Sequence, residues 1–576
     1  MDKKRLNKLI DVAAGRVPAD IVIKDCKTVD VFNGCVIEGD IAICDGLIAG
    51  VGQYEGRREI DANGQYAAPG FIDSHIHIES AYVSPEELGR LLVPHGTTTI
   101  IADPHEITNV CGLSGLEYMI EASKRSALDI KWMLPSCVPA TPFEHSGASV
   151  AAADMEQVMD RDEILGLGEF MNYPGVVNAD EGVLDKLLVA IRHRKHIDGH
   201  SPGLCGNGLN AYASAGIRTD HECSTVAEMT DRLSRGMYVL MRQGSACHNL
   251  KALLKAVTPF NSRRCLLCSD DCQPKTIFSV GHLENHLRIC VNAGIDPIMA
   301  IQMASINAAE CFGIKDRGAI APGLRADIVL LDSLTGFNVM KVFIAGDEAA
   351  ADGRYALPVS RQDISPTRGR FRVKDFSRDR LKLTIRSEKA HVITMIPGGV
   401  VTRNEVSEIS RDEKGDFIFD PSKDIVKIAV IERHHNTGNV AVALLKGYGI
   451  KRGAIALSIA HDSHNIIVVG VSDDDMDFAV QKLIEQNGGI VLADSQRIIE
   501  SLPMPIAGLM SDQSGEWVDE KLTRIHRAAV DVLGVHDTFE PVMTLCFMAL
   551  PVIPELKLTD MGLFDVNKFS FIPVEA

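Results

Sequence analysis

Residues 71–79 read FIDSHIHIE, an apolar run interrupted by Asp73, His75 and His77 near its end. Its length and its Ile and Phe content are typical of a short buried strand. Side chains two positions apart on a strand point the same way, so His75 and His77 converge and can share one divalent cation. An isolated pair of this kind is more often a hydrogen-bonded strand end, so its meaning depends on the rest of the chain.

This run is the first of eight short apolar runs between residues 69 and 320. Amphipathic stretches such as EGVLDKLLVAIRHRK (181–195) lie between them. Eight strands that alternate with helices over about 250 residues are typical of a (β/α)8 barrel, so we predict an α/β protein with a TIM-type barrel domain at 69–320. The other seven runs are TTTIIADP (97–104), KWMLPSCVP (131–139), ILGLGEFMNY (164–173), HIDGHSP (196–202), IRTDHEC (217–223), YVLMRQGS (238–245) and CLLCSDD (265–271).

Two β-rich stretches flank the predicted barrel. Residues 20–68 carry many β-branched residues with Asn-Gly and Asp-Gly turns, and a similar stretch returns at 326–347. We therefore predict one small β-sandwich domain built from residues 1–68 plus 321–365. Residues 366–576 alternate strands with helices, which predicts a separate C-terminal α/β or α+β domain.

Polar side chains also end four of the later strands. Glu169 ends the fourth, His200 the fifth, His221 the sixth and Asp270 the eighth. In a parallel barrel these ends meet at one face, where active sites lie, together with the two histidines of the first strand. Burying four imidazoles and two carboxylates together is costly, and a pair of divalent metal ions offsets that cost. Nitrogen and oxygen ligands without a thiolate suit Zn, Fe, Mn or Co.

Composition excludes several other classes of protein. The net charge of −18 argues against a nucleic acid or an anionic membrane as partner. The N-terminus has no apolar signal segment, and no uncharged run is long enough to span a membrane. The 14 cysteines are scattered, which favours reduced thiols and a cytoplasmic location. A homo-oligomer, with a dimer favoured, is the expected assembly.

The motifs resemble those of the amidohydrolase superfamily. PGFIDSHIHIES (69–80), the carboxylate after the fourth strand, two later histidines and the final Asp270 carry that resemblance. Four further segments resemble the bacterial adenine deaminases, and with them the resemblance covers nearly the whole chain. These segments are GTTTIIADPHEITNV (96–110), GLGEFMNYPGVV (166–177), IDGHSPGL (197–204) and LPVIPELKLTD (550–560).

The resemblance implies a ligand set and a reaction. One metal would be bound by His75, His77 and Asp270 and the second by His200 and His221, with Glu169 bridging them. Many superfamily members use a carboxylated lysine as the bridge, so the glutamate separates this chain from the hydantoinase branch. By resemblance, Mn or Fe is the favoured metal. The implied activity is hydrolytic deamination of adenine to hypoxanthine and ammonia, in purine salvage.

The expected mechanism uses a hydroxide bridged by the two metals, because divalent ions lower the pKa of bound water. This hydroxide attacks C6 of adenine, and Asp270 takes the proton and passes it toward ammonia. A side chain near N1 or N7 must assist the ring: His105 is the first choice, although it could instead support a metal ligand, and Glu106 is the second. Asn172 and Ser269 are expected to line the pocket.

Two other functions remain open from the sequence. Another binuclear amidohydrolase could act on a different cyclic amidine or amide, because metal ligands specify hydrolysis better than substrate. A catalytically inactive scaffold is disfavoured because every ligand position is filled. In the C-terminal domain, His434, His435 and the cluster at 461–464 are either plain loop residues or part of a cover over the barrel mouth.

Overall fold

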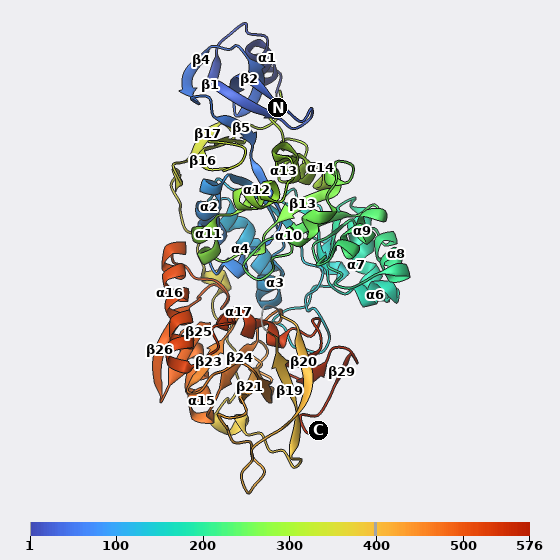
Figure 1. The fold of residues 1–576 in the computed structure, drawn as a ribbon, viewed down its shortest axis with the longest axis vertical. Coiled ribbons are helices and arrows are strands. Elements are labelled where there is room, and N and C mark those ends of the chain that lie inside the picture. Colours follow the sequence, from blue (N-terminus) through green and yellow to red (C-terminus); the bar gives the residue numbers. More distant parts are fainter. Residues whose placement is uncertain (1, 397–399) are drawn as a thin grey trace.

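The middle of the chain folds into a curled parallel sheet, which confirms the predicted TIM-type barrel (Figure 1). The structure is a computed structural model and describes residues 2–396 and 400–576. Parallel ladders join β6 through β10 and β11 through β13, and β14 pairs with β6 to close that side of the ring. The strands are β6 (Phe71–His77), β7 (Thr97–Ala102), β8 (Asp129–Leu134), β9 (Ile164–Phe170), β10 (His196–Gly199), β11 (Thr219–Asp220), β12 (Tyr238–Arg242), β13 (Cys265–Cys268) and β14 (Asp270–Asp271).

Helices cover the outside of this sheet. Every residue of β6 and β7 is buried, as expected for parallel strands that are covered on both faces. Helix α7 (Glu181–Arg192) follows β9, packs against β9 and β10, and buries Leu187 and Val189. The amphipathic pattern at 181–195 therefore becomes a helix with one face on the barrel.

A nine-stranded sheet lies next to the barrel and uses both of its flanks. Its central pairing is antiparallel, with Ala68 of β5 opposite Val329 of β15. Strand β5 leads into β6 through Gly70, where an added Cβ would lie 2.2 Å from Oγ1 of Thr98, so glycine permits this close junction. The strands are β1 (Ala19–Asp30), β2 (Cys35–Cys44), β3 (Leu47–Gly52), β4 (Gly56–Asp61), β5 (Tyr66–Pro69), β15 (Ile328–Leu331), β16 (Val339–Ile344), β17 (Asp347–Ala351) and β18 (Arg354–Tyr355).

The C-terminal part of the chain forms a mixed eight-stranded sheet and a small three-stranded one (orange to red in Figure 1). Helix α15 (Asp473–Glu485) packs against β23, β24 and β25 of the larger sheet. The strands are β19 (Lys389–Met395), β20 (Thr402–Glu408), β21 (Ile425–Ile431), β22 (Val440–Lys446), β23 (Ala454–Leu457), β24 (Ile466–Gly470), β25 (Gly489–Asp494), β26 (Arg497–Pro503), β27 (Leu556–Thr559), β28 (Gly562–Asp565) and β29 (Ser570–Phe571). The predicted domain boundaries and the sandwich form of the flanking sheet stay predictions.

The C-terminal part is fixed to the barrel by the loop that follows β8. Nε2 of His435 lies 2.7 Å from the carbonyl oxygen of Ser146, and Nδ2 of Asn465 donates to the carbonyl oxygen of His145 at 2.8 Å. Nδ1 of His145 lies 2.6 Å from Oδ2 of Asp560. Because β8 ends at the barrel mouth, these contacts hold the C-terminal sheets at the same end as the predicted site.

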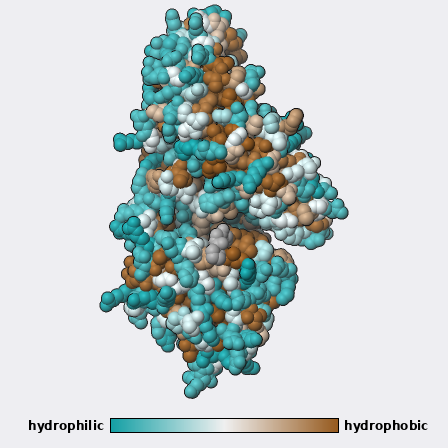
Figure 2. Space-filling view, in the orientation of Figure 1, coloured by the Kyte–Doolittle hydropathy of each residue, from teal (hydrophilic) through white to brown (hydrophobic). Residues whose placement is uncertain are grey.

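The face shown in Figure 2 is mainly hydrophilic, with patches of hydrophobic residues between hydrophilic ones. In the two described ranges, no helix is both long and apolar enough to cross a bilayer.

Candidate active site

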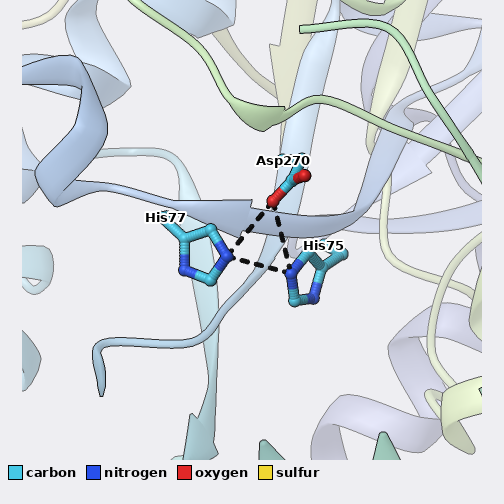
Figure 3. Close-up of side chains that lie close together, drawn as sticks. All are labelled: His75, His77 and Asp270. Atoms are coloured by element: carbon cyan, nitrogen blue, oxygen red, sulfur yellow. Dashed lines mark hydrogen bonds and ion pairs between the residues drawn. The ribbon is translucent and has the colours of Figure 1, made fainter. Parts of the chain in front are cut away.

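The two histidines of β6 meet the first residue of β14 at the barrel mouth (Figure 3). Nε2 of His77 lies 3.2 Å from Oδ1 of Asp270, and Nε2 of His75 lies 3.7 Å from the same oxygen. The two Nε2 atoms are 3.1 Å apart. Three donor atoms thus converge from two adjacent strands, as the spacing of the HxH motif predicts.

Glu169 at the end of β9 connects this group to a second pair of histidines. Its Oε1 lies 3.4 Å from Nε2 of His77. Its Oε2 lies 2.6 Å from Nδ1 of His200 and 3.2 Å from Nε2 of His221. The two oxygens of one carboxylate therefore face different histidines, which is the arrangement a bridging ligand requires.

Buried carboxylates orient these side chains from behind. Oδ2 of Asp198 lies 3.0 Å from Nδ1 of His75, so the imidazole turns its Nε2 toward the site. The backbone N–H of Glu169 donates to Oδ2 of Asp103 at 2.9 Å, and Nδ1 of His77 lies 3.1 Å from the carbonyl oxygen of Asp103. Such partners fix the tautomer and direction of metal-binding groups.

The carboxylates of the site each lie beside basic side chains: Glu169 contacts imidazoles, and Asp270 contacts an imidazole and the guanidinium of Arg242. Burial opposes a charge on His221, but its hydrogen bond with Glu169 outweighs this and raises the pKa of His221 to about 10. Burial also acts to raise the pKa of Glu169, but the neighbouring His200 and His221 hold it well below its usual range. In the same way, His77 and Arg242 outweigh burial and keep the pKa of Asp270 well below its usual range. Both carboxylates are therefore ionised, and the imidazole of His221 carries a proton that a metal ion would displace.

The donor set fits divalent metal ions. Four overlapping groups of three residues each bring one donor atom per residue to within 4.8 Å of the others, and all their donors are imidazole nitrogens or carboxylate oxygens. The groups are His75–His77–Asp270, His75–Glu169–His221, His77–His105–Glu169 and His200–His221–Glu222. Glu169 belongs to two of them, in keeping with its central position.

A cavity of about 620 Å³ opens beside these residues and is shared with the C-terminal part of the chain. Its volume suits a small organic substrate. The C-terminal part contributes a largely apolar wall, together with one imidazole and one carboxylate. These lining residues are Val400, Val401, His461, Asp462, Phe547, Leu550, Val552, Ile553 and Pro554. The cluster at 461–464 thus includes residues that border the site, whereas Nε2 of His434 lies 2.7 Å from the carbonyl oxygen of Ser463 and supports that loop.

The residues predicted to assist the reaction border the cavity, whereas the two predicted to line the pocket do not. His105 and Glu106, in the first turn of α3 (His105–Cys111), both border the cavity, and Nδ1 of His105 lies 3.3 Å from Oε1 of Glu169. Asn172 is not brought there: it caps α6 (Tyr173–Val177) by accepting a hydrogen bond from the backbone N–H of Gly175. Ser269 is fully buried and donates to Asp73, beneath the strand ends.

Several residues at the site are missing from the sequence-based prediction. Arg242 ends β12, and its Nη1 donates to Oδ2 of Asp270 at 2.9 Å while it also pairs with Glu222. The rule that found the other strand ends would have found Arg242, because it is the first charged residue of the run at 238–245. Asp103 and Asp198 carry the same strand-end signal. His461 and Asp462 have no strand-end signal; they belong to the cluster at 461–464, for which the sequence left open a loop or a cover over the barrel mouth.

The fold and the site together define a metal-dependent hydrolase of the amidohydrolase class, and residues 66–349 match the Amidohydrolase family. Residues 399–570 match the Adenine deaminase C-terminal domain. The chain is 70% identical to "Adenine deaminase 2" of Desulfotalea psychrophila and 51% identical to "Adenine deaminase" of Ligilactobacillus salivarius, over 100% of each chain in both comparisons. It is 48% identical to "Adenine deaminase" of Nitratidesulfovibrio vulgaris, covering 99% of both chains. The chain belongs to the adenine deaminase family.

Proposed function

We propose that this enzyme hydrolyses adenine to hypoxanthine and ammonia and so serves purine salvage. The observation that carries the proposal is the Glu169 carboxylate between two sets of histidines, in a chain 70% identical to a named adenine deaminase. The reaction replaces the amino group at C6 with oxygen from water and releases that group as ammonia. The cavity of about 620 Å³ accommodates a free purine base.

Two divalent ions would be held by the six predicted ligands, His75, His77, Glu169, His200, His221 and Asp270. When bound, they lower the pKa of water enough to supply hydroxide near neutral pH. We favour Mn or Fe, with Zn or Co as the alternatives that the same ligands accept.

The side chains at the mouth divide the proton transfers between them. Asp270 takes the proton of the attacking water, because its carboxylate is ionised and is oriented by Arg242. It then returns the proton to the leaving nitrogen as the C6–N bond breaks. The other proton of the water must end on N1 of hypoxanthine. His105 and Glu106 both border the cavity from the end of β7, and His105 is the first choice to deliver that proton to the ring.

The test is an ultraviolet assay of the purified, metal-loaded protein with adenine, adenosine and methylated adenines, with metal content measured on the same sample. We expect hypoxanthine from adenine and about two transition-metal ions per chain. Hydrolysis of another cyclic amidine or amide, with no hypoxanthine formed, would replace adenine as the substrate. A protein that binds no metal after growth in metal-rich medium would contradict the hydrolase itself.

Two further proposals concern the assembly and its location. We propose a cytoplasmic homo-oligomer, with a dimer favoured, because closed two-fold dimers are the commonest assembly among soluble homo-oligomers. Light scattering on the purified protein tests the dimer: a mass of one chain at assay concentration would contradict it.

A further inference from the structure

Two consecutive residues of the barrel face two consecutive residues of the C-terminal part across the cavity. His105 and Glu106 begin α3, and His461 and Asp462 lie in the loop between β23 and β24. Nε2 of His105 lies 3.8 Å from Oδ1 of Asp462, and Nδ1 of His461 lies 3.2 Å from Oε1 of Glu106. Each pair joins an imidazole of one part to a carboxylate of the other.

Glu106 depends on His461 for a charged partner. The only other hydrogen bond to its side chain in the described ranges comes from Oγ of Ser80 at 3.2 Å, and this neutral hydroxyl also contacts Asp271. Burial acts to raise the pKa of Glu106, but the charge and hydrogen bond of His461 outweigh it and hold that pKa below its usual range. An ionised carboxylate only accepts hydrogen bonds, so Glu106 suits an N–H of a purine ring or of its amino group.

The imidazole of His461 is itself held in one orientation. It stacks on the ring of Phe547, with centroids 4.5 Å apart and an interplanar angle of 20°. Phe547 lies in the short helix η8 (Phe547–Ala549), whose backbone is tied to β27 because Nζ of Lys557 donates to the carbonyl oxygen of Phe547 at 3.0 Å. His461 is 9% exposed, and both His461 and Phe547 border the cavity.

We propose that His461 is a positioning residue: it holds the Glu106 carboxylate directed at the substrate, so the C-terminal part completes the active site. This inference rests on the proposed deamination only for the identity of the substrate. The role of His461 in orienting Glu106 is a property of the two side chains and is measurable without turnover.

The kinetic test is a double-mutant cycle with Glu106→Gln, His461→Ala and the double variant, assayed with adenine in the metal-loaded full chain. If His461 acts through Glu106, each single change lowers kcat/KM by about 10- to 100-fold, and the double variant is no worse than E106Q within about twofold. His461→Asn, which places an amide donor near the position of Nδ1, is expected to recover part of the loss. His536→Ala is the matched control, because His536 is also a C-terminal imidazole paired with a carboxylate, Asp424, but it does not border the cavity and should keep kcat/KM within about twofold. The proposal would be overturned if the two single losses in kcat/KM multiplied in the double variant, or if H461A kept the kcat/KM of the wild type.

The second measurement separates this inference from the proposed activity and also serves if H461A does not fold. In the zinc-loaded full chain with carbon-13-labelled histidine, the His461 resonance is assigned by its loss in H461N. We expect it to shift in E106Q and to stay in place in Glu163→Gln, a change at the far end of β9 from the site. A resonance unmoved by E106Q would refute the positioning role even in an active deaminase. An enzyme without adenine turnover, but with the shift present, would refute the substrate and leave the positioning role supported.

Discussion

Two regions of the molecule border the same cavity in different ways. The barrel strand ends contribute charged groups that contact one another directly, such as Glu169 with His77 and His200. The C-terminal part contributes mainly apolar side chains, such as Leu550, from loops beside short helices and strands. Strands hold groups with the precision that shared metal ligands need, whereas loops can shape a pocket for a particular substrate. Substitutions at the barrel strand ends should therefore lower kcat or metal binding, and those in the apolar wall of the C-terminal part should raise KM.

The largest expected effect comes from Glu169→Gln. A neutral amide cannot bridge two cations, so we expect kcat to fall by at least roughly 10³-fold and the metal content to fall with it. Ammonia release and metal analysis on the same sample measure both. Glu163→Gln is the control, because Glu163 precedes the same strand at its other end and pairs with Arg161. Full metal content and activity in E169Q would break the distinction between the two regions.

Asp198→Asn should have the next largest effect. The amide keeps the shape of the side chain but weakens its hold on Nδ1 of His75, and loss of such a partner typically costs about 10- to 100-fold in metal affinity or activity. Metal titration of the chelator-treated protein measures the affinity. Asp162→Asn, at an exposed position, controls for loss of one carboxylate. An unchanged affinity would show that His75 needs no support from behind.

Lys557→Met tests the C-terminal region through the pH dependence of stability. Burial lowers the pKa of Lys557 to about 7, whereas the unfolded chain keeps an ordinary lysine pKa near 10.4. Between these values the unfolded chain binds a proton that the folded chain lacks, so this residue makes stability rise with pH by up to about 1.4 kcal/mol per pH unit. Urea unfolding of both proteins from pH 7 to 9 should show the wild type gaining relative to K557M. A constant difference would mean that Lys557 stays charged when folded.

The smallest expected effect comes from Leu550→Ala in the apolar wall. Removing part of this wall should raise KM for adenine roughly fivefold and change kcat by less than about twofold. Leu188→Ala, on the exposed face of α7, is the control for the assay. A fall in kcat with unchanged KM would place the wall in the chemical step and remove the contrast between the two regions.

The barrel was predictable because buried parallel strands are continuous apolar runs, and the polar residues that end them share one face. The structure places the six ligands predicted by this strand-end rule close together, although their binding of metal stays a prediction. It failed for Ser269, since a strand-end residue can point beneath the site, toward Asp73, as well as into it. For His461 the sequence left two alternatives, a plain loop or a cover over the barrel mouth, because no local pattern shows that the loop between β23 and β24 lies against the end of β7.

The pairing of β5 with β15 also bears on how the chain is made. The sheet begun by β1 to β5 is completed by strands that leave the ribosome only after the whole barrel has been synthesised. Until then β5 has an unpaired edge, and an unpaired edge invites association with other chains. The barrel is thus inserted between two parts of the nine-stranded sheet, and its synthesis delays the completion of that sheet. Stalled chains that end before β15 should aggregate more readily than chains released after β18, which sedimentation of the two nascent products would reveal.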